Sequence, residues 1–185
     1  MNPSAPSAAH LMIGVAGGSG SGKTTILEAF LGLCPCPVTV LPQDAYYHDL
    51  SPLPLVERGR QNFDHPDALD SSLFEAHLLQ LRRGQPVPAP LYDFTTHTRI
   101  GTHPIAPAPV ILAEGTLVLA IAALARHLTL RVFVDAPPDI RFIRRLQRDR
   151  VERGRSVDSV IQQYLETVRP MDLAFIAPCK AHADL

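Results

Sequence analysis

A glycine-rich loop that directly follows an apolar run is the feature that most constrains this chain. Residues 11–16 are apolar enough for a buried strand, and residues 17–24 spell G-x-x-x-x-G-K-T before a helical pattern over 23–32. Glycines allow successive backbone amides to face phosphate oxygens, and the N-terminus of the following helix adds the positive end of its dipole. The sequence therefore predicts a cradle for a nucleoside triphosphate, ATP or GTP, with a merely flexible loop as the alternative.

The residues of this loop have distinct expected tasks. Lys23 is expected to reach the β and γ phosphates and to take part in catalysis, and the Thr24 hydroxyl is expected to bind Mg²⁺. The predicted phosphate-binding residues of the loop are Gly17, Gly18, Ser19, Gly20, Ser21, Gly22, Lys23, Thr24 and Thr25.

Length and composition favour one globular domain. The 185 residues carry a formal net charge of −1 and are 46% hydrophobic, which argues against a disordered chain and against one that coats nucleic acid. We expect a disordered N-terminal tail over 1–10 and a single domain over 11–185. The longest apolar run, 117–125, is too short to span a bilayer, and the tail lacks a signal-peptide pattern, so we expect a cytoplasmic protein without a membrane partner. The cysteines, including those of Cys34-Pro35-Cys36, are expected to be free thiols.

Strand-like and helix-like segments alternate along the chain. Strands are predicted over 11–16, 38–41, 110–113 and 130–134, and helices near 23–32, 71–83 and 137–150. This order predicts an α/β fold in which a parallel sheet is covered by helices on both faces. Two stretches, 45–70 and 84–109, are rich in Pro, His and aromatic residues with little periodicity, so we expect an irregular arm on the substrate side.

Acidic residues follow three of the predicted strands, at the sheet edge where ligands of such folds bind. Asp44 could accept a proton from an attacking hydroxyl, and capping of a turn is its alternative role. Glu114 could hold Mg²⁺ together with Thr24, and capping of a strand end is the alternative. Asp135 precedes a proline-rich helix start, so we assign it to structure.

Arginines are concentrated between residues 139 and 155. This segment holds seven arginines against three acids, an excess of +4, so the rest of the chain carries −5. Four of them are spaced i, i+3, i+4, i+7 and share one helix face, whereas Ile140 and Ile143 are expected to face the core. These four are Arg141, Arg144, Arg145 and Arg148. A solvated surface is the alternative to a polyphosphate site.

Several separate segments resemble the uridine kinase (uridine-cytidine kinase) family of P-loop nucleoside kinases, and they follow the family order from about residue 13 to 184. The segment 62–70, Asn-Phe-Asp-His-Pro-Asp-Ala-Leu-Asp, is far more specific than a phosphate loop. The other matching pieces are 14–24, 43–47, Tyr92-Asp93-Phe94 with His97 and Arg99, Glu114-Gly115, Arg148-Asp149, 152–155, Gln163-Tyr164 and 167–171.

The resemblance implies a P-loop kinase that transfers the γ-phosphoryl group of ATP to the 5′-hydroxyl of uridine or cytidine with Mg²⁺, and that often forms a homotetramer. Asp44 then matches the general base. Arg148 and Arg153 match a mobile lid over the phosphates, in which Gly154 would allow movement, and Arg148 counts as catalytic. The residues implied for the nucleoside are Tyr47, Asp64, Tyr92, Phe94, His97, Arg145, Arg155 and Gln163.

Within that set, Asp64 would accept hydrogen bonds from the ribose 2′ and 3′ hydroxyls. Tyr92 and His97 would form hydrogen bonds with the edge of the pyrimidine base. An Asx turn is the alternative for Asp64, and a structural role is the alternative for the histidine. The helix after the lid should bury one apolar stripe, consisting of Val157, Val160, Ile161, Tyr164, Leu165 and Val168, and should stop at Pro170.

Two departures from the family pattern leave other functions open. Family members continue past the equivalent of Leu185 with a further strand, so a truncated C-terminal strand is expected here, and Ala45-Tyr46 differ from the usual residues. A phosphoribulokinase-like or pantothenate-kinase-like enzyme and a catalytically impaired nucleotide-binding protein are the alternatives. A GTPase is disfavoured because no Asn-Lys-x-Asp segment occurs.

Overall fold

A four-stranded parallel sheet forms the centre of the protein. The computed structural model describes residues 10–185. The sheet order is β2-β5-β1-β6. The strands are β1 (Leu11–Ala16), β2 (Val38–Pro42), β5 (Val110–Glu114) and β6 (Leu130–Phe133). All four strands predicted from apolar runs are therefore confirmed, with ends that differ by one residue at most.

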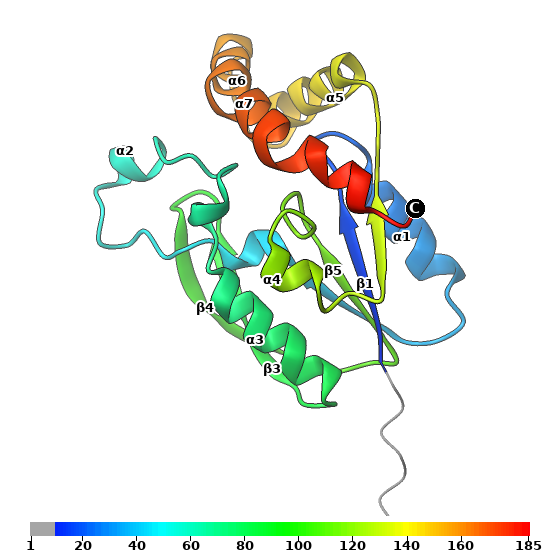
Figure 1. Cartoon of the computed structure of the whole chain (residues 1–185). Helices are drawn as coiled ribbons and strands as arrows, with labels where there is room; N and C mark the ends of the chain where they lie inside the picture. The colour runs from blue at the N-terminus through cyan, green and yellow to red at the C-terminus, as the bar shows by residue number, and fades with distance from the viewer. Residues whose placement is uncertain (1–9) are drawn as a thin grey trace, which may run out of the picture.

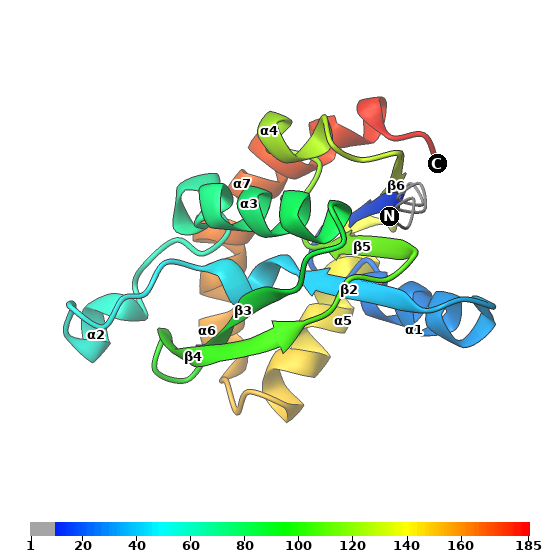
Figure 2. The ribbon, with the colours of Figure 1, turned by 90° about the horizontal axis from the view of Figure 1, so that it is seen from below.

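Alternate residues of the strands pack against two helical layers. On one face Met12 and Ile111 belong to a cluster with Phe74 of α3 (Ser71–Arg82). On the other face Ile13 and Leu112 pack against Leu27 and Phe30 of α1 (Lys23–Leu33). Figure 2 shows α3 and α4 (Ala122–Ala125) on one side of the sheet, and α1 and α5 (Pro138–Val151) on the other. The predicted α/β fold with helices on both faces is confirmed.

The arm that was expected to be irregular over 84–109 is a β-hairpin instead. Strands β3 (Val87–Asp93) and β4 (Thr98–Ile105) pair antiparallel and form a second sheet of their own. Pro88 lies opposite Pro104 in this register. A two-stranded ribbon tolerates proline because each strand has a free edge, where a missing amide breaks no ladder bond. The prolines hid the strand pattern in the sequence.

The stretch 45–70 is largely irregular, as expected. Its helical parts are short: η1 (Gln43–Tyr46), α2 (Leu55–Arg58) and η2 (Pro66–Ala68). In Figure 1 the part of this stretch around α2 extends away from the central sheet, on the same side of the molecule as the hairpin.

The helical segment after α5 continues past Pro170, so the predicted stop is wrong. It begins as α6 (Val157–Gln163) and passes through π-helical turns at Tyr164–Val168 and Asp172–Ile176, with α7 (Arg169–Met171) between them and a 3₁₀ helix (Ala177–His182) at the end. Pro170 lies inside this continuous segment, between the two π-helical turns, and the helix continues although proline has no amide to donate.

The apolar stripe predicted on that segment is buried only in part. Val160 and Val168 are buried, whereas Val157, Ile161 and Leu165 are 39%, 38% and 59% exposed. The π-helical turn takes an extra residue and shifts the register at Leu165. Val157 and Ile161 precede that turn, so they lie outside the buried face of the regular helix α6 itself.

The orientation predicted for α5 is also wrong. Ile140 and Ile143 are 38% and 48% exposed, while Arg145 and Asp149 are buried. Periodicity groups residues on a face but does not say which face turns inward. Here the charged face covers the site described below.

Both ends of the described chain are held by hydrogen bonds. The Nδ1 atom of His10 lies 2.8 Å from the Ala108 carbonyl oxygen, and the rest of the expected tail, 1–9, lies outside the described residues. Leu185 contacts the edge of β6, where its carbonyl oxygen accepts a bond from the amide of Phe133 at 2.9 Å. Within residues 10–185, no helix combines the length and apolar character needed to cross a membrane.

Candidate active site

The loop between β1 and α1 has a backbone that only glycine can adopt at some positions. Gly20 has φ of 79°, in the left-handed region. A Cβ atom on Gly20 would lie 2.3 Å from the carbonyl oxygen of Arg141, and one on Gly17 would lie 2.4 Å from that of Val134. The loop is thus pressed against α5 and the end of β6, which fixes its shape.

Lys23, the first residue of α1, turns its ammonium group back over this loop. Its Nζ atom donates to the carbonyl oxygens of Gly17 at 2.9 Å and Gly18 at 3.4 Å. Burial lowers the pKa of the ammonium group, while the carboxylates of Glu114 and Asp44 act in the opposite direction. One lysine therefore lies within electrostatic reach of both candidate carboxylates.

Asp44 and Glu114 lie at the same edge of the sheet as the loop. Glu114 ends β5 and pairs with Val15 on one side and Pro42 on the other, and Asp44 lies two residues after Pro42. Burial raises the pKa of Glu114, the charge of Lys23 lowers it, and the charge of Asp44 raises it again. Parallel strands bring these residues together because their carboxyl ends share one edge.

The oxygen atoms at this edge suit Mg²⁺. Thr24 supplies a hydroxyl and Glu114 a carboxylate, and both line the same cavity. Among residues 10–185, no group of three or more His, Cys, Asp or Glu side chains is placed to hold a metal ion. Mg²⁺ is usually held by one or two protein groups together with water and substrate phosphates, so the donor set fits this ion.

One cavity of about 730 Å³ joins the loop, the hairpin and the helix α5. The predicted site residues that line it are Ser19, Gly20, Gly22, Lys23, Thr24, Thr25, Asp44, Tyr47, Asp64, Tyr92, Phe94, His97, Glu114, Arg145, Arg148, Arg153, Arg155 and Gln163. Three predicted residues, Gly17, Gly18 and Ser21, are not in its lining. A volume of this size matches the range of ligand sites, and the walls come from segments far apart in sequence.

The wall formed by the hairpin is aromatic. Tyr47 packs edge-on against Phe63 with ring centroids 5.3 Å apart, and Phe63 stacks on His97 at 4.6 Å. Tyr92 contacts both Tyr47 and Phe94. Flat aromatic faces at the far end of the cavity suit a planar ring.

Asp64 is the carboxylate of this part of the cavity. Burial raises its pKa, the charge of Arg145 lowers it, and the charge of Asp44 raises it. The hydroxyl of Thr167 donates to its Oδ2 atom at 3.4 Å. Asp44 and Asp64 thus face one crevice.

Arg145 connects α5 to the phosphate loop and to the helix α6. Its Nη1 atom donates to Ser19 Oγ at 2.9 Å and its Nη2 atom to Gln163 Oε1 at 2.8 Å. Arg155 donates to the same oxygen of Gln163. Burial lowers the pKa of the Arg145 guanidinium, with Asp64 and Asp149 opposing that effect.

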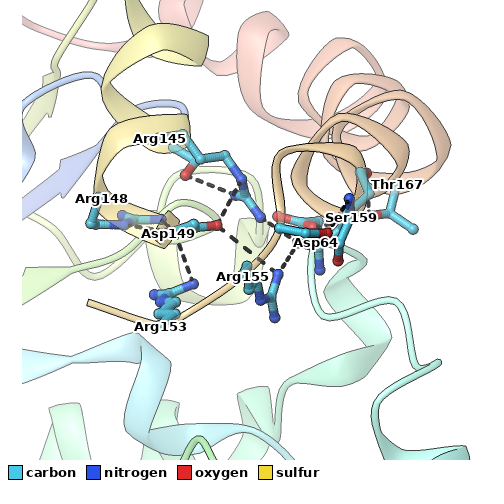
Figure 3. Close-up of polar contacts among 11 residues, drawn as sticks. Asp64, Arg145, Arg148, Asp149, Arg153, Arg155, Ser159 and Thr167 are labelled. Carbon is cyan, nitrogen blue, oxygen red and sulfur yellow. Dashed lines mark hydrogen bonds and ion pairs between the residues drawn. The ribbon is translucent and has the colours of Figure 1, made fainter. Parts of the chain in front are cut away.

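Four arginines surround one carboxylate at the end of α5 (Figure 3). Asp149 is fully buried, and its nearest distances to guanidinium nitrogens are 2.9 Å for Arg148, 3.5 Å for Arg145 and Arg153, and 4.0 Å for Arg155. We call these five residues the arginine cluster. The cluster supplies the positive wall of the cavity.

Sequence comparison identifies the family to which this architecture belongs. The model of the phosphoribulokinase / uridine kinase family matches residues 12–185. The chain belongs to this family. It is 53% identical to a uridine kinase of Chloroflexus aurantiacus over 177 residues, which covers 95% of this chain and 85% of that protein. It is 48% identical to a uridine kinase of Lactobacillus helveticus over 178 residues, with 95% and 84% covered.

The fold agrees with that membership. A structure of phosphoribulokinase from Rhodobacter spheroides superimposes with a TM-score of 0.71 at 16% identity, covering 96% of this chain and 69% of that one. The chain is therefore a P-loop kinase, as its phosphate loop and family resemblance predicted.

Sequence reasoning missed four residues that line the cavity of this family member, namely Phe63, Thr95, Thr116 and Glu152. Arg144, which was expected only as part of the arginine stripe, lines the cavity as well. Phe63 lies inside the specific segment 62–70 and directly precedes Asp64. The assignment of Asp64 to the nucleoside was therefore a signal that Phe63 also lies at the site. Thr95 is in the turn of a hairpin that the sequence pattern did not reveal.

Proposed function

We propose that this protein is a uridine kinase that transfers the γ-phosphoryl group of ATP to the 5′-hydroxyl of uridine or cytidine, giving UMP or CMP. The identity of about half of all residues with relatives named uridine kinase supports this substrate class. The observation that carries the proposal is that Asp44, Asp64 and the phosphate loop line one cavity.

Catalysis in this proposal is mainly alignment and charge neutralisation. Phosphoryl transfer requires the attacking oxygen in line with the leaving group and positive charge around the γ-phosphoryl group. Asp44 accepts the proton of the 5′-hydroxyl as general base. Lys23 and Arg148 neutralise charge on the transferred group, and the amides of the phosphate loop, with Arg153, bind the remaining phosphate oxygens.

Thr24 and Glu114 are the residues that would hold Mg²⁺ in this proposal, directly or through water. When bound, the ion shields the negative charge of the β and γ phosphates. The proton-accepting residue, Asp44, is not part of that pair.

Recognition of the nucleoside rests on hydrogen bonds to its sugar and its base. Asp64 accepts hydrogen bonds from the 2′ and 3′ hydroxyls of the ribose. A deoxyribose lacks the 2′ hydroxyl and cannot donate both bonds. Tyr92 and His97 read the base edge in this proposal. The remaining contacts are assigned to Tyr47, Phe94, Arg145, Arg155 and Gln163.

The partners in this proposal are small molecules, namely a nucleoside and a nucleoside triphosphate. A homotetramer is proposed on family resemblance alone, and light scattering of the purified protein tests it. The cytoplasmic location stays a prediction of the sequence.

Product analysis by mass spectrometry tests the proposal directly. The protein is incubated with ATP, Mg²⁺ and a mixture of uridine, cytidine, thymidine, pantothenate and ribulose 5-phosphate. We expect UMP and CMP. Phosphorylation of pantothenate or ribulose 5-phosphate in their place would overturn the substrate class.

The role of Asp44 is tested with a matched pair of variants. Asp44→Asn should bind ATP like the unmodified protein but lose turnover by about 10²-fold or more, because a positioned base contributes about 10²–10⁴-fold. The control is Asp67→Asn, since the Asp67 side chain is 92% exposed. Full activity of Asp44→Asn would refute the assignment of the base.

A further inference from the structure

We propose that Asp149 is a positioning residue that gathers the four arginines of the cluster and so orients Arg148 and Arg153 over the phosphates. This inference rests on the proposed function, which gives those arginines their substrate. It adds a residue that lines no part of the cavity itself and to which the sequence pattern assigned no role.

The burial of Asp149 is the first argument. Its side chain is 0% exposed, and an isolated buried carboxylate is strongly unfavourable unless it is paired. Four guanidinium groups from Arg145, Arg148, Arg153 and Arg155 provide that pairing. The Asp149 carboxylate is thus a negative charge that all four guanidinium groups approach to 4.0 Å or less.

The charge balance is the second argument. Within the cluster, four arginines against one aspartate leave a surplus of three positive charges, 4 − 1 = 3. Arg144 and Glu152, which also line the cavity, cancel each other. Like charges at these distances repel each other, and the central carboxylate offsets part of that repulsion. A polyanionic ligand offsets the repulsion that remains among the arginines, so the charge of the cluster suits the binding of a triphosphate.

The geometry of Arg148 is the third argument. Its Nε and Nη2 atoms both donate to Asp149 Oδ1, at 3.0 Å and 2.9 Å. A guanidinium group is a rigid planar fork, so two bonds to one oxygen fix the direction in which its remaining donors point. Asp149 therefore sets the orientation of the arginine that was assigned to the transferred phosphoryl group.

The lid backbone is anchored at the same residue. The amide of Arg155 donates to the carbonyl oxygen of Asp149 at 3.1 Å, which closes the segment 150–154 into a loop. Gly154 has φ of 62° and no atom within 4 Å of a Cβ placed on it. The backbone anchor survives a side-chain substitution, so a variant of Asp149 tests the charge alone.

The test compares Asp149→Asn with Asp139→Asn, the same substitution at an exposed position of the same helix. We expect kcat of Asp149→Asn to fall by about 10- to 100-fold, because small misplacements of catalytic groups have effects of that size. We expect kcat to change more than the KM for uridine, because Asp149 bonds Arg148 directly whereas Arg145 and Arg155 lie 3.5 Å and 4.0 Å from it. Asp139→Asn should behave like the unmodified protein. Unchanged kcat in Asp149→Asn would overturn the proposal.

A double-mutant cycle separates positioning from a merely structural role. If Asp149 acts largely through Arg148, then Asp149→Asn causes a smaller loss of kcat in an Arg148→Gln background than in the unmodified protein. Losses that multiply would overturn the proposal. Should Asp149→Asn fail to fold, Asp149→Glu keeps the charge one methylene further out, and the same non-additivity is expected for it.

Amide hydrogen exchange tests the proposal without uridine turnover. With ATP added, we expect protection of residues 148–156 in the unmodified protein and loss of that protection in Asp149→Asn, while exchange in the sheet stays the same. Faster exchange throughout the sheet would mean that Asp149 only stabilises the fold. If the unmodified protein does not phosphorylate uridine, the proposed function fails, and this ATP experiment still decides the role of Asp149.

Discussion

The Nε atom of Arg99 donates a hydrogen bond to the carbonyl oxygen of Tyr47 at 2.9 Å. The same guanidinium reaches the carbonyl oxygen of Tyr46 and the carboxylate of Asp70, each at 3.2 Å. Arg99 lies in β4, so it ties the hairpin to the backbone that follows Asp44 and to the N-cap of α3. Asp44, the proposed general base, and the aromatic wall are thereby held relative to each other.

We expect Arg99→Lys to lower kcat/KM for uridine by roughly 10-fold and to leave ATP binding unchanged. Lysine keeps the charge but cannot bond three acceptors in one plane, and each lost bond to a buried acceptor costs about 1–3 kcal/mol. Steady-state kinetics and calorimetric ATP binding measure the two effects. Arg126→Lys, at a side chain that is 66% exposed, serves as the control, and an equal loss of ATP affinity in Arg99→Lys would contradict the prediction.

Asp64→Asn should raise Tm at pH 7.5 and weaken uridine binding. Burial raises the pKa of Asp64 above its ordinary value of 3.8, so the ionised carboxylate disfavours the folded state at pH values above the folded pKa. This penalty declines as the pH falls through the folded pKa and vanishes below 3.8, where the folded and unfolded states are both protonated. Thermal unfolding at pH 7.5 and pH 4 should therefore show a gain in Tm that shrinks on acidification. A constant gain at both pH values would rule out this origin.

His77 should make the stability of the protein fall at mildly acidic pH. Burial lowers its pKa below the ordinary value of 6.5, so the unfolded state takes up a proton first. The free energy of unfolding then declines as the pH drops from 6.5 toward the folded pKa. Urea unfolding at pH 7.5 and 5.5 measures this decline, which should be smaller in His77→Gln. Glutamine can still bond Tyr46 Oη, which lies 2.8 Å from His77 Nδ1, and His48→Gln, at an exposed position, is the control.

Two glycine substitutions should have opposite effects. Gly20→Ala introduces a Cβ atom 2.3 Å from the Arg141 carbonyl oxygen at a φ of 79°, so we expect loss of ATP binding and a lower Tm. Gly32→Ala lies inside α1 with no atom within 4 Å of the new Cβ, and alanine should stabilise the helix by about 1 kcal/mol. Chemical unfolding and ATP titration of both variants check this pair. Retained ATP affinity in Gly20→Ala would show that the loop can relax.

The sequence predicted the central sheet well because its two inner strands, β1 and β5, are buried on both faces. Continuous apolar runs such as 110–113 carry that signal directly, and the carboxyl ends of those runs located Asp44 and Glu114 at one edge. The family resemblance supplied the cavity residues of the hairpin and the lid. Nearly all of them line one cavity, and their individual roles remain proposals.

The errors arose where a local pattern has two readings. Prolines at 88, 90 and 104 suggested irregular chain, yet a two-stranded ribbon accepts them. The spacing of the arginines in α5 showed that they share a face of the helix, but not whether that face turns toward the protein or toward solvent. In the structure this face turns inward, where Arg145 and Asp149 are buried. Pro170 is compatible with either a helix end or a helix start, and the π-helical turns before and after it are not visible in apolar spacing.

The long helical segment from 157 to 182 lines the cavity at Gln163 and supports the phosphate loop indirectly. Gln163 lies in the part of the cavity that we assign to the nucleoside. Further along, the Asp172 carboxylate accepts two hydrogen bonds from Arg141, at 2.8 Å and 2.9 Å, and the Arg141 backbone lies against Gly20 of the phosphate loop. A ligand that orders one end of this helical segment lowers the conformational entropy that is lost when a second ligand binds at the other end. The two substrates should accordingly bind with synergy, and thermodynamic reciprocity requires the enhancement to be equal whichever of them arrives first.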